Sequence, residues 1–167
     1  MNKSISNLDF LKMASIALKE ADNLSYRSRG NCIKMGMYFS KTREGRFWIK
    51  TIPYGYKKRW TEGHFRLVPV KAEAEAIKAI YTLFLDGVLL RDILAIVQHN
   101  RCPINGVNAL KRILVNPLYS GYQYVSAIDD LPGGYFPANI QGIISHEDWQ
   151  TAQQNLIAKN YIKSKIN

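Results

Sequence analysis

The sequence predicts a mainly α protein with one small β-hairpin, in the α+β class. A long N-terminal helix precedes a helix-turn-helix or winged-helix-like domain. Two observations predict this class. Apolar residues recur at three- and four-residue spacing in several separate segments, as they do on amphipathic helices. By contrast, only residues 118–144 combine Tyr, Val, Ile and Gly around a turn in the manner of a hairpin. The 167 residues suffice for one domain with an appendage.

The first predicted element is a helix over residues 5–25. Its apolar positions are Phe10, Met13, Ala14, Ala17, Ala21 and Leu24. The pattern allows the helix to continue to Ser40, although Gly30 and Gly36 each cost about 1 kcal/mol relative to alanine. So broad an apolar surface on a terminal helix needs a partner. We therefore expect this helix to pack on the rest of the chain or to self-associate as a dimer or tetramer.

Residues 41–66 form the second region, which we interpret as a basic linker. Basic and aromatic residues alternate there without helical periodicity, and Pro53 and Gly55 mark a turn. Short strands are expected near 47–52 and 64–68. The folded domain is then predicted to occupy 67–160, with a frayed tail at 161–167.

Three helices are predicted at the start of this domain, at 71–86, 89–99 and 106–116. Gly87 is suited to end the first, and Asn100 can adopt the left-handed conformation that ends the second. Asn105 is a candidate N-cap of the third helix, and Pro117 disfavours helical geometry at Asn116.

The domain is predicted to close with a hairpin and a last helix. Runs at 119–127 and 135–144 flank a turn-forming segment at 129–134. Ser145 and Asp148 have the spacing of a capping box. The apolar face of the last helix consists of Trp149, Ala152 and Leu156.

The charge of the chain is its most informative bulk property. Lys and Arg number 23 against 13 acidic residues, which gives a net charge of +10. Eleven of these cations lie between Arg27 and Arg66, opposed only by Glu44 and Glu62. A purely solubilising surface usually mixes both signs, whereas a field of one sign attracts nucleic acid or an anionic membrane. No apolar run is long enough to predict a membrane span.

The outer face of the third helix carries candidate recognition residues. Asn108, Lys111 and Arg112 form a polar stripe opposite the apolar Leu110 and Leu114. Asn, Lys and Arg contact adenine and guanine edges or phosphates. The short spacing between the second and third helices permits a helix-turn-helix, in which the third helix would enter the major groove of double-stranded DNA. The alternative is an ordinary amphipathic helix with a solvated face.

The basic linker supplies a second set of candidates. These are Arg43, Arg46, Lys50, Lys57, Lys58 and Arg59. A basic arm can follow the minor groove or the phosphates. The aromatic residues among them either stack on unpaired bases or pack beneath a loop; they are Trp48, Tyr54, Tyr56 and Trp60.

Signals for catalysis or cofactors are weak. The two cysteines, Cys32 and Cys102, are too few for a disulfide scaffold or a cysteine-only zinc site. The three histidines lack metal-ligand spacing, and no glycine-rich phosphate loop is present. We therefore predict no catalytic residue, metal or cofactor. The low cysteine usage and the charge suggest a cytoplasmic, nucleoid-associated protein.

Beyond these patterns, the chain from about Asn23 to Asn160 resembles the recombinase domain of large serine recombinases, of the site-specific resolvase-invertase type. The resemblance rests on the order and spacing of short pieces. They are Asn23-Leu24-Ser25, Glu44-Gly45-Arg46, Pro53-Tyr54-Gly55-Tyr56, Leu67-Val68-Pro69, Leu85-Asp86-Gly87, Arg91-Asp92-Ile93, Ile113 to Gly121 and Ile143 to Trp149.

The resemblance implies a sequence-specific DNA-binding module of an enzyme that integrates, resolves or inverts DNA. The N-terminal helix would be the last helix of a preceding catalytic domain, the basic linker would track the minor groove, and helix 106–116 would contact the major groove. The family's Arg-x-Ser catalytic segment and its downstream cysteine-rich zinc ribbon are absent from this sequence. Asn105 and Gly106 stand where relatives often have a tryptophan.

These departures lead us to expect part of a longer recombinase, or a degenerate fragment, that is not an enzyme by itself. The residues leave two other functions open. One is a free-standing winged-helix regulator, and the other is a basic module that binds an acidic protein.

Overall fold

The computed structural model describes Ser15, Lys19 and residues 28–47, 51–61, 64–100, 102–128 and 131–162. The chain divides into two compact units, Met1–Ser40 and Lys41–Asn167. Ser15, Lys19 and residues 28–42 are helical, and the helical segment 28–42 includes Gly30 and Gly36. The other residues of the helix predicted over 5–25 lie outside the described part of the chain.

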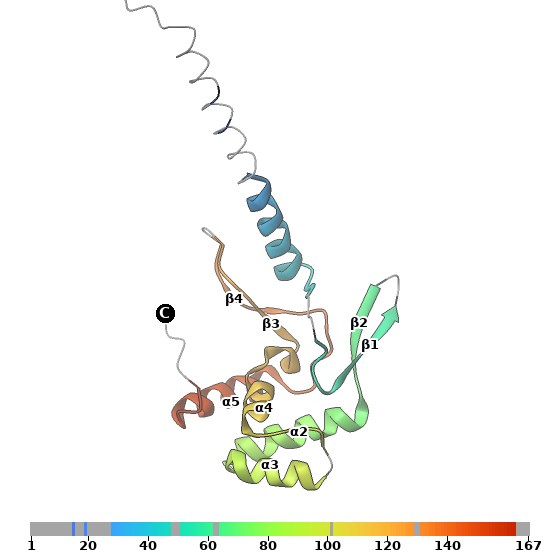
Figure 1. Ribbon diagram of the computed structural model, residues 1–167, viewed down its shortest axis with the longest axis vertical. Coiled ribbons are helices and arrows are strands. Elements are labelled where there is room, and N and C mark those ends of the chain that lie inside the picture. The colour runs from blue at the N-terminus through green and yellow to red at the C-terminus, as the bar shows by residue number, and fades with distance from the viewer. Residues whose placement is uncertain are drawn as a thin grey trace, which may run out of the picture. The chain divides into compact units, whose positions relative to one another are not determined.

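The second unit contains two hairpins and a group of helices (Figure 1). In chain order the elements are β1 (Tyr56–Thr61), β2 (His64–Pro69), α2 (Lys71–Leu85), α3 (Leu90–His99), α4 (Val107–Val115), the 3-10 helix η1 (Pro117–Ser120), β3 (Tyr122–Val125), β4 (Gly134–Pro137) and α5 (His146–Ala158). The predicted fold class is confirmed. The helices predicted at 71–86, 89–99 and 106–116 begin and end within one residue of their expected positions, and the last helix begins directly after Ser145, as expected.

The β1–β2 hairpin corrects our interpretation of the basic linker. Its strands pair antiparallel from Tyr56 opposite Pro69 to Thr61 opposite His64. The strand expected at 64–68 is confirmed. The one expected at 47–52 is wrong for the described residues of that range, which are irregular, while 48–50 lie outside the description. The sequence concealed β1 because most of its side chains are exposed, so no apolar alternation marks it.

The β3–β4 hairpin is shorter than the sequence suggested. Residues 138–144 leave the sheet because their backbone turns back on the start of the hairpin. The amide of Ala138 donates to the carbonyl of Gly121 at 2.8 Å, and that of Ile143 donates to the carbonyl of Tyr119 at 2.7 Å. These bonds bring a loop rather than a strand beside η1.

Two predicted helix ends differ from the structure. Asn105 does not cap α4; Gly106 occupies the N-cap with φ +91°, and no side chain caps this end. Asn100 ends α3 with φ −81° rather than in the left-handed region. Gly87 follows the end of α2 with φ +89°, as expected.

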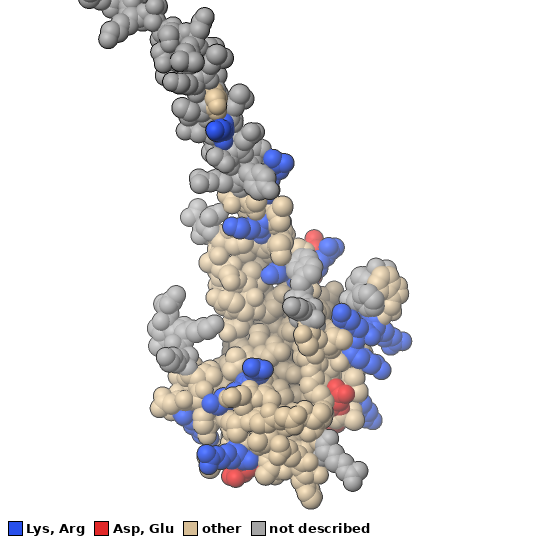
Figure 2. All heavy atoms as spheres, viewed as in Figure 1, with Lys and Arg blue, Asp and Glu red and all other residues tan. Residues whose placement is uncertain are grey.

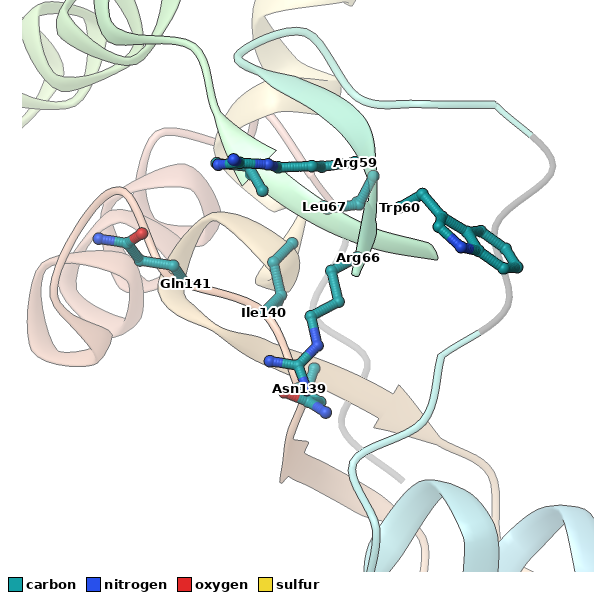
Figure 3. Close-up of a pocket in the computed structure, with 9 residues that line it drawn as sticks. Arg59, Trp60, Arg66, Leu67, Asn139, Ile140 and Gln141 are labelled. Carbon is teal, nitrogen blue, oxygen red and sulfur yellow. The ribbon is translucent and has the colours of Figure 1, made fainter. Parts of the chain in front are cut away.

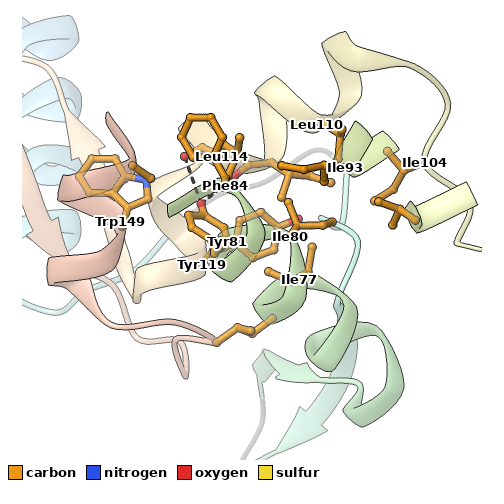
Figure 4. Close-up of a cluster of buried hydrophobic side chains, with 14 of the residues drawn as sticks. Ile77, Ile80, Tyr81, Phe84, Ile93, Ile104, Leu110, Leu114, Tyr119 and Trp149 are labelled. Carbon is orange, nitrogen blue, oxygen red and sulfur yellow. Dashed lines mark hydrogen bonds between the residues drawn. The ribbon is translucent and has the colours of Figure 1, made fainter. Parts of the chain in front are cut away.

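The core lies between the helices (Figure 4). Helix α2 packs against α3 and α5, and α4 packs against the same two helices. The fully or almost fully buried side chains include Ile77, Ile80, Tyr81, Phe84, Leu90, Ile93, Leu110, Leu114, Trp149, Ala152 and Leu156. Tyr161 and Ile162, which the sequence analysis placed in the tail, are half-buried against this core. The domain boundaries themselves stay predictions.

Candidate nucleic-acid interface

Helix α4 presents its predicted recognition stripe to solvent. Asn108 and Arg112 are exposed, one turn apart on the same face. Lys111 is half-buried, and its Nζ lies 5.3 Å from the centre of the Tyr161 ring. The structure therefore leaves Asn108 and Arg112 available for contact, whereas Lys111 is partly engaged by a cation–π interaction.

The opposite face of α4 fixes the helix on the core. Leu110 and Leu114 are completely buried. The Tyr81 hydroxyl lies 3.0 Å and 3.1 Å from the carbonyl oxygens of Ile113 and Leu114, so α2 supplies a donor for the last turn of α4. Gln153 on α5 donates to the carbonyl of Leu114 at 2.7 Å. The helix end, which lacks internal partners, is thus satisfied by two neighbouring helices.

The helices α3 and α4 follow each other in the chain, as the helix-turn-helix predicted from the sequence requires. The two helices pack together, and Ile104 in the connection between them is 3% exposed. An extended Asn116 ends α4, and its side chain accepts from the amide of Leu118 at 3.1 Å. Gly121, at φ +81°, then leads directly into the β3–β4 hairpin. A hairpin that follows the second helix of such a pair is the winged-helix order predicted from the sequence.

Further predicted cations lie on the β1–β2 hairpin. Lys57, Lys58 and Arg59 are exposed on β1. Figure 2 shows Lys and Arg atoms gathered where Figure 1 places this hairpin. Its base is anchored by Tyr56, whose buried hydroxyl lies 3.2 Å from the carbonyl of Leu118 and 2.9 Å from that of Gln141. The cations therefore stand on an ordered ribbon rather than on an extended linker.

The segment before this hairpin carries the remaining described candidates. Arg43 and Arg46 are exposed, and the Nε of Arg46 lies 2.9 Å from a carboxylate oxygen of Glu44. An exposed pair of this kind contributes little to stability. The amide of the buried Gln123 donates to the carbonyls of Lys41 and Arg46 at 3.1 Å and 3.0 Å, which fixes this segment beside β3. Lys50 lies outside the described residues.

The aromatic residues of the same region divide between the two predicted uses. Tyr56 is buried and stacks on Tyr119 at 5.9 Å, and Tyr54 is half-buried. Trp60 is 61% exposed. Trp48 lies outside the description. Packing beneath the hairpin thus accounts for the two tyrosines, whereas Trp60 is the largely exposed ring among the described members of this set.

A groove of about 730 Å³ separates the β1–β2 hairpin from the loop at 138–141 (Figure 3). Arg59 and Arg66 line one side, and Asn139 and Gln141 line the other. Sequence reasoning did not select Asn139 or Gln141, because a polar residue in a loop carries no signal of what lies opposite it.

The described residues hold no group of three or more His, Cys, Asp and Glu side chains placed to bind a metal ion. Among the same residues, no helix has the length and apolar character to cross a membrane.

Comparison with known proteins identifies the family. The family model described as Recombinase matches residues 71–159, from the start of α2 to the residue after α5. No curated protein matches the sequence significantly.

Two solved structures share the fold. One is described as "Crystal Structure of a LSR-DNA Complex", with 20% identity and a TM-score of 0.56 over 76% of this chain. The other is described as "Sequence Requirements of the Listeria innocua prophage attP site", with 21% identity and a TM-score of 0.52 over 74% of this chain. This chain covers 38% of the first and 51% of the second.

The family match spans more than half of the chain and includes the helix pair, the hairpin after it and the closing helix. The protein therefore belongs to the Recombinase family.

Proposed function

We propose that this chain binds double-stranded DNA sequence-specifically as part of a site-specific serine recombinase. The observation that carries the proposal is the fixed, outward-facing stripe of α4, with Asn108 and Arg112 exposed and the helix end held by Tyr81 and Gln153. The family membership and the two DNA-related structures of the same fold support it.

The proposed mechanism divides the contacts into two kinds. Asn108 and Arg112 hydrogen-bond base edges in the major groove and determine the sequence that is bound. Lys57 and Lys58 contact phosphates, which supplies affinity without sequence preference. Lys111 contributes less than its charge suggests, because it already lies over Tyr161.

The strand-exchange chemistry is proposed to belong to a part of the parent enzyme that carries the serine nucleophile. The exposed apolar residues Ile33 and Met37 of the N-terminal helix support self-association of that helix. We place the protein with the nucleoid in the cytoplasm, on the strength of its positive charge.

The experiment is fluorescence anisotropy of a labelled 30-base-pair duplex, titrated with protein at several salt concentrations, followed by selection of the preferred site from a random pool. Log K should fall with log salt by about 0.9 for each phosphate neutralised. Arg112→Ala should cost about 1–3 kcal/mol on the selected site and relax preference at its base pair, whereas Lys57→Ala should weaken all duplexes alike.

The control is Lys78→Ala, which removes a cation from α2 that is paired with Glu75 at 3.0 Å and lies in neither proposed contact set. Unchanged affinity and preference in Arg112→Ala would exclude α4 as the recognition helix. If the wild-type protein binds polyglutamate but no duplex at low salt, the proposed function is wrong and the partner is an acidic protein.

A further inference from the structure

The groove beside the β1–β2 hairpin has the composition of an anion site. Its polar lining consists of Arg59, Arg66, Asn139 and Gln141, with Val68 and Ile140 adding apolar surface. Among the residues that the structure describes, no acidic side chain lines this groove. Two guanidinium groups, two neutral amides and a strip of apolar surface match the phosphates and the sugars of a nucleic-acid backbone.

The two arginines bring like charges to one face of the hairpin. Arg59 and Arg66 stand directly opposite each other in the β1–β2 register. Like charges in this position destabilise a hairpin. Among the described residues, Arg59 forms no ion pair. Figure 3 shows the guanidinium of Arg66 directed toward Asn139, while that of Arg59 extends in another direction, so the positive charge is spread along the groove.

Both walls of the groove are held in place by bonds outside it. Tyr56, at the start of β1, donates to the carbonyl of Gln141 at 2.9 Å and so ties the hairpin to the opposite wall. The backbone amide of Asn139 donates to the backbone carbonyl of Gly45 at 2.8 Å, which leaves the Asn139 side chain to line the groove. Gly45 has φ +65°, and a Cβ there would lie 2.9 Å from that amide nitrogen, so only glycine permits this close approach. The groove is thus preorganised, which lowers the ordering cost of binding.

We propose that this groove binds the sugar–phosphate backbone of one DNA strand, with Arg59 and Arg66 contacting successive parts of it and with the amides of Asn139 and Gln141 as further donors. This inference rests on the proposed function and assigns a second contact to it. Helix α4 reads bases, whereas the groove fixes the orientation of the domain on the duplex without reading sequence.

The test measures affinity for the labelled duplex with the full-length chain and variants in and outside the groove. Arg59→Ala should weaken binding about 10- to 100-fold, the value of one or two charge-assisted hydrogen bonds, and should lower the salt slope by about 1. Arg59→Lys should keep the slope but recover only part of the affinity, because an ammonium lacks the bidentate fork.

A charge-matched pair separates the groove from general electrostatics. Asn139→Asp places a negative charge inside the groove, and Gln154→Glu adds the same charge on the exposed side of α5. The first should weaken binding about 10-fold or more, while the second should bind like wild type. Circular dichroism and thermal melting identify any variant that fails to fold. If a variant does not fold, NMR of the wild type replaces it: the Arg59 and Arg66 Nε resonances should shift when duplex is added, and unshifted resonances would contradict the groove proposal.

The outcomes distinguish this inference from the function on which it rests. A wild type that binds no duplex contradicts the proposed function. Suppose that the wild type binds duplex and that Arg112→Ala weakens binding. If Arg59→Ala and Asn139→Asp then bind as tightly as the Gln154→Glu control, the groove proposal alone is overturned. Wild-type affinity for polyglutamate that matches its affinity for duplex, and is lost in Arg59→Ala, would assign the groove to an acidic peptide.

Discussion

At the scale of single residues, buried tyrosine hydroxyls join segments that are distant in the sequence. Tyr81 connects α2 to the end of α4, Tyr56 connects β1 to the loop at Gln141, and the Tyr119 hydroxyl lies 2.8 Å from the carbonyl of Tyr54. Burial raises the pKa of all three phenols well above the ordinary value near 10, because a phenolate would lose its hydration there. Each hydroxyl therefore remains a neutral donor in the folded protein.

These pKa shifts predict an alkaline loss of stability. A phenol whose pKa is raised by folding contributes its full share to the free energy of unfolding below its unfolded pKa, near 10. As the pH rises from there toward the folded pKa, that share is lost, because the unfolded chain then binds fewer protons than the folded one. Urea unfolding between pH 7 and pH 11.5 should show a free energy of unfolding that is level up to about pH 9.5 and falls above it.

The Tyr81→Phe variant gives this prediction its sharpest form. It should lose about 1 kcal/mol at pH 7, the net value of a buried hydroxyl's hydrogen bonding, and its alkaline decline should be shallower than that of wild type. Tyr124→Phe, on a ring that is 56% exposed, is the control for removing a phenol at pH 7. If stability declines as steeply at alkaline pH in Tyr81→Phe as in wild type, the buried Tyr81 phenol does not cause the alkaline loss of stability.

At the scale of elements, local signals predicted the helices well and the first hairpin poorly. The apolar spacing of α2 and α5 and the glycine after α2 identify those helices without tertiary information. One half of the predicted capping box of α5 forms: the Ser145 Oγ accepts from the backbone amide of Asp148 at 3.0 Å, and the Ser145 hydroxyl donates to the Asp148 carboxylate at 2.7 Å. In contrast, β1 is defined by its pairing with β2. Because most of its side chains are exposed, its sequence does not alternate between apolar and polar residues as that of a half-buried strand does.

The capping box yields a prediction at this scale. Ser145→Ala should lower the free energy of unfolding by about 1 kcal/mol, because the amide of Asp148 loses its acceptor. Ser145→Thr keeps the hydroxyl and should retain most of the stability. Denaturant midpoints of the two variants, at equal m-values, measure the difference. Equal midpoints for Ala and Thr would show that the hydroxyl does not stabilise α5.

At the scale of the whole molecule, the chain consists of two compact units. The described side chains of the hydrophobic cluster between the helices belong to the second unit, from Phe47 to Ile162. The described part of the N-terminal helix exposes Ile33 by 65% and Met37 by 44%. These residues are four positions apart and lie on one face of the helix, as a surface for a second copy of the chain would require.

Self-association through this face predicts a concentration-dependent oligomer. Sedimentation of the full chain should show a dimer or larger species, and Ile33→Glu combined with Met37→Glu should shift it to monomer, because a carboxylate is costly to bury in an apolar interface. Asn31→Glu, at an exposed position on another side of the same helix, is the matched control. A wild type that remains monomeric at high concentration would exclude the helix as an interface.

The sequence by itself determined the helices of the second unit, the class of the fold, the concentration of positive charge and the outward stripe of α4, because periodicity, caps and composition act over a few neighbouring residues. The tertiary structure decided the rest. It paired β1 with β2, turned Lys111 onto Tyr161, and set Arg59 and Arg66 across a groove from Asn139 and Gln141. Those arrangements depend on contacts between residues far apart in the chain, and local pattern carries no record of them.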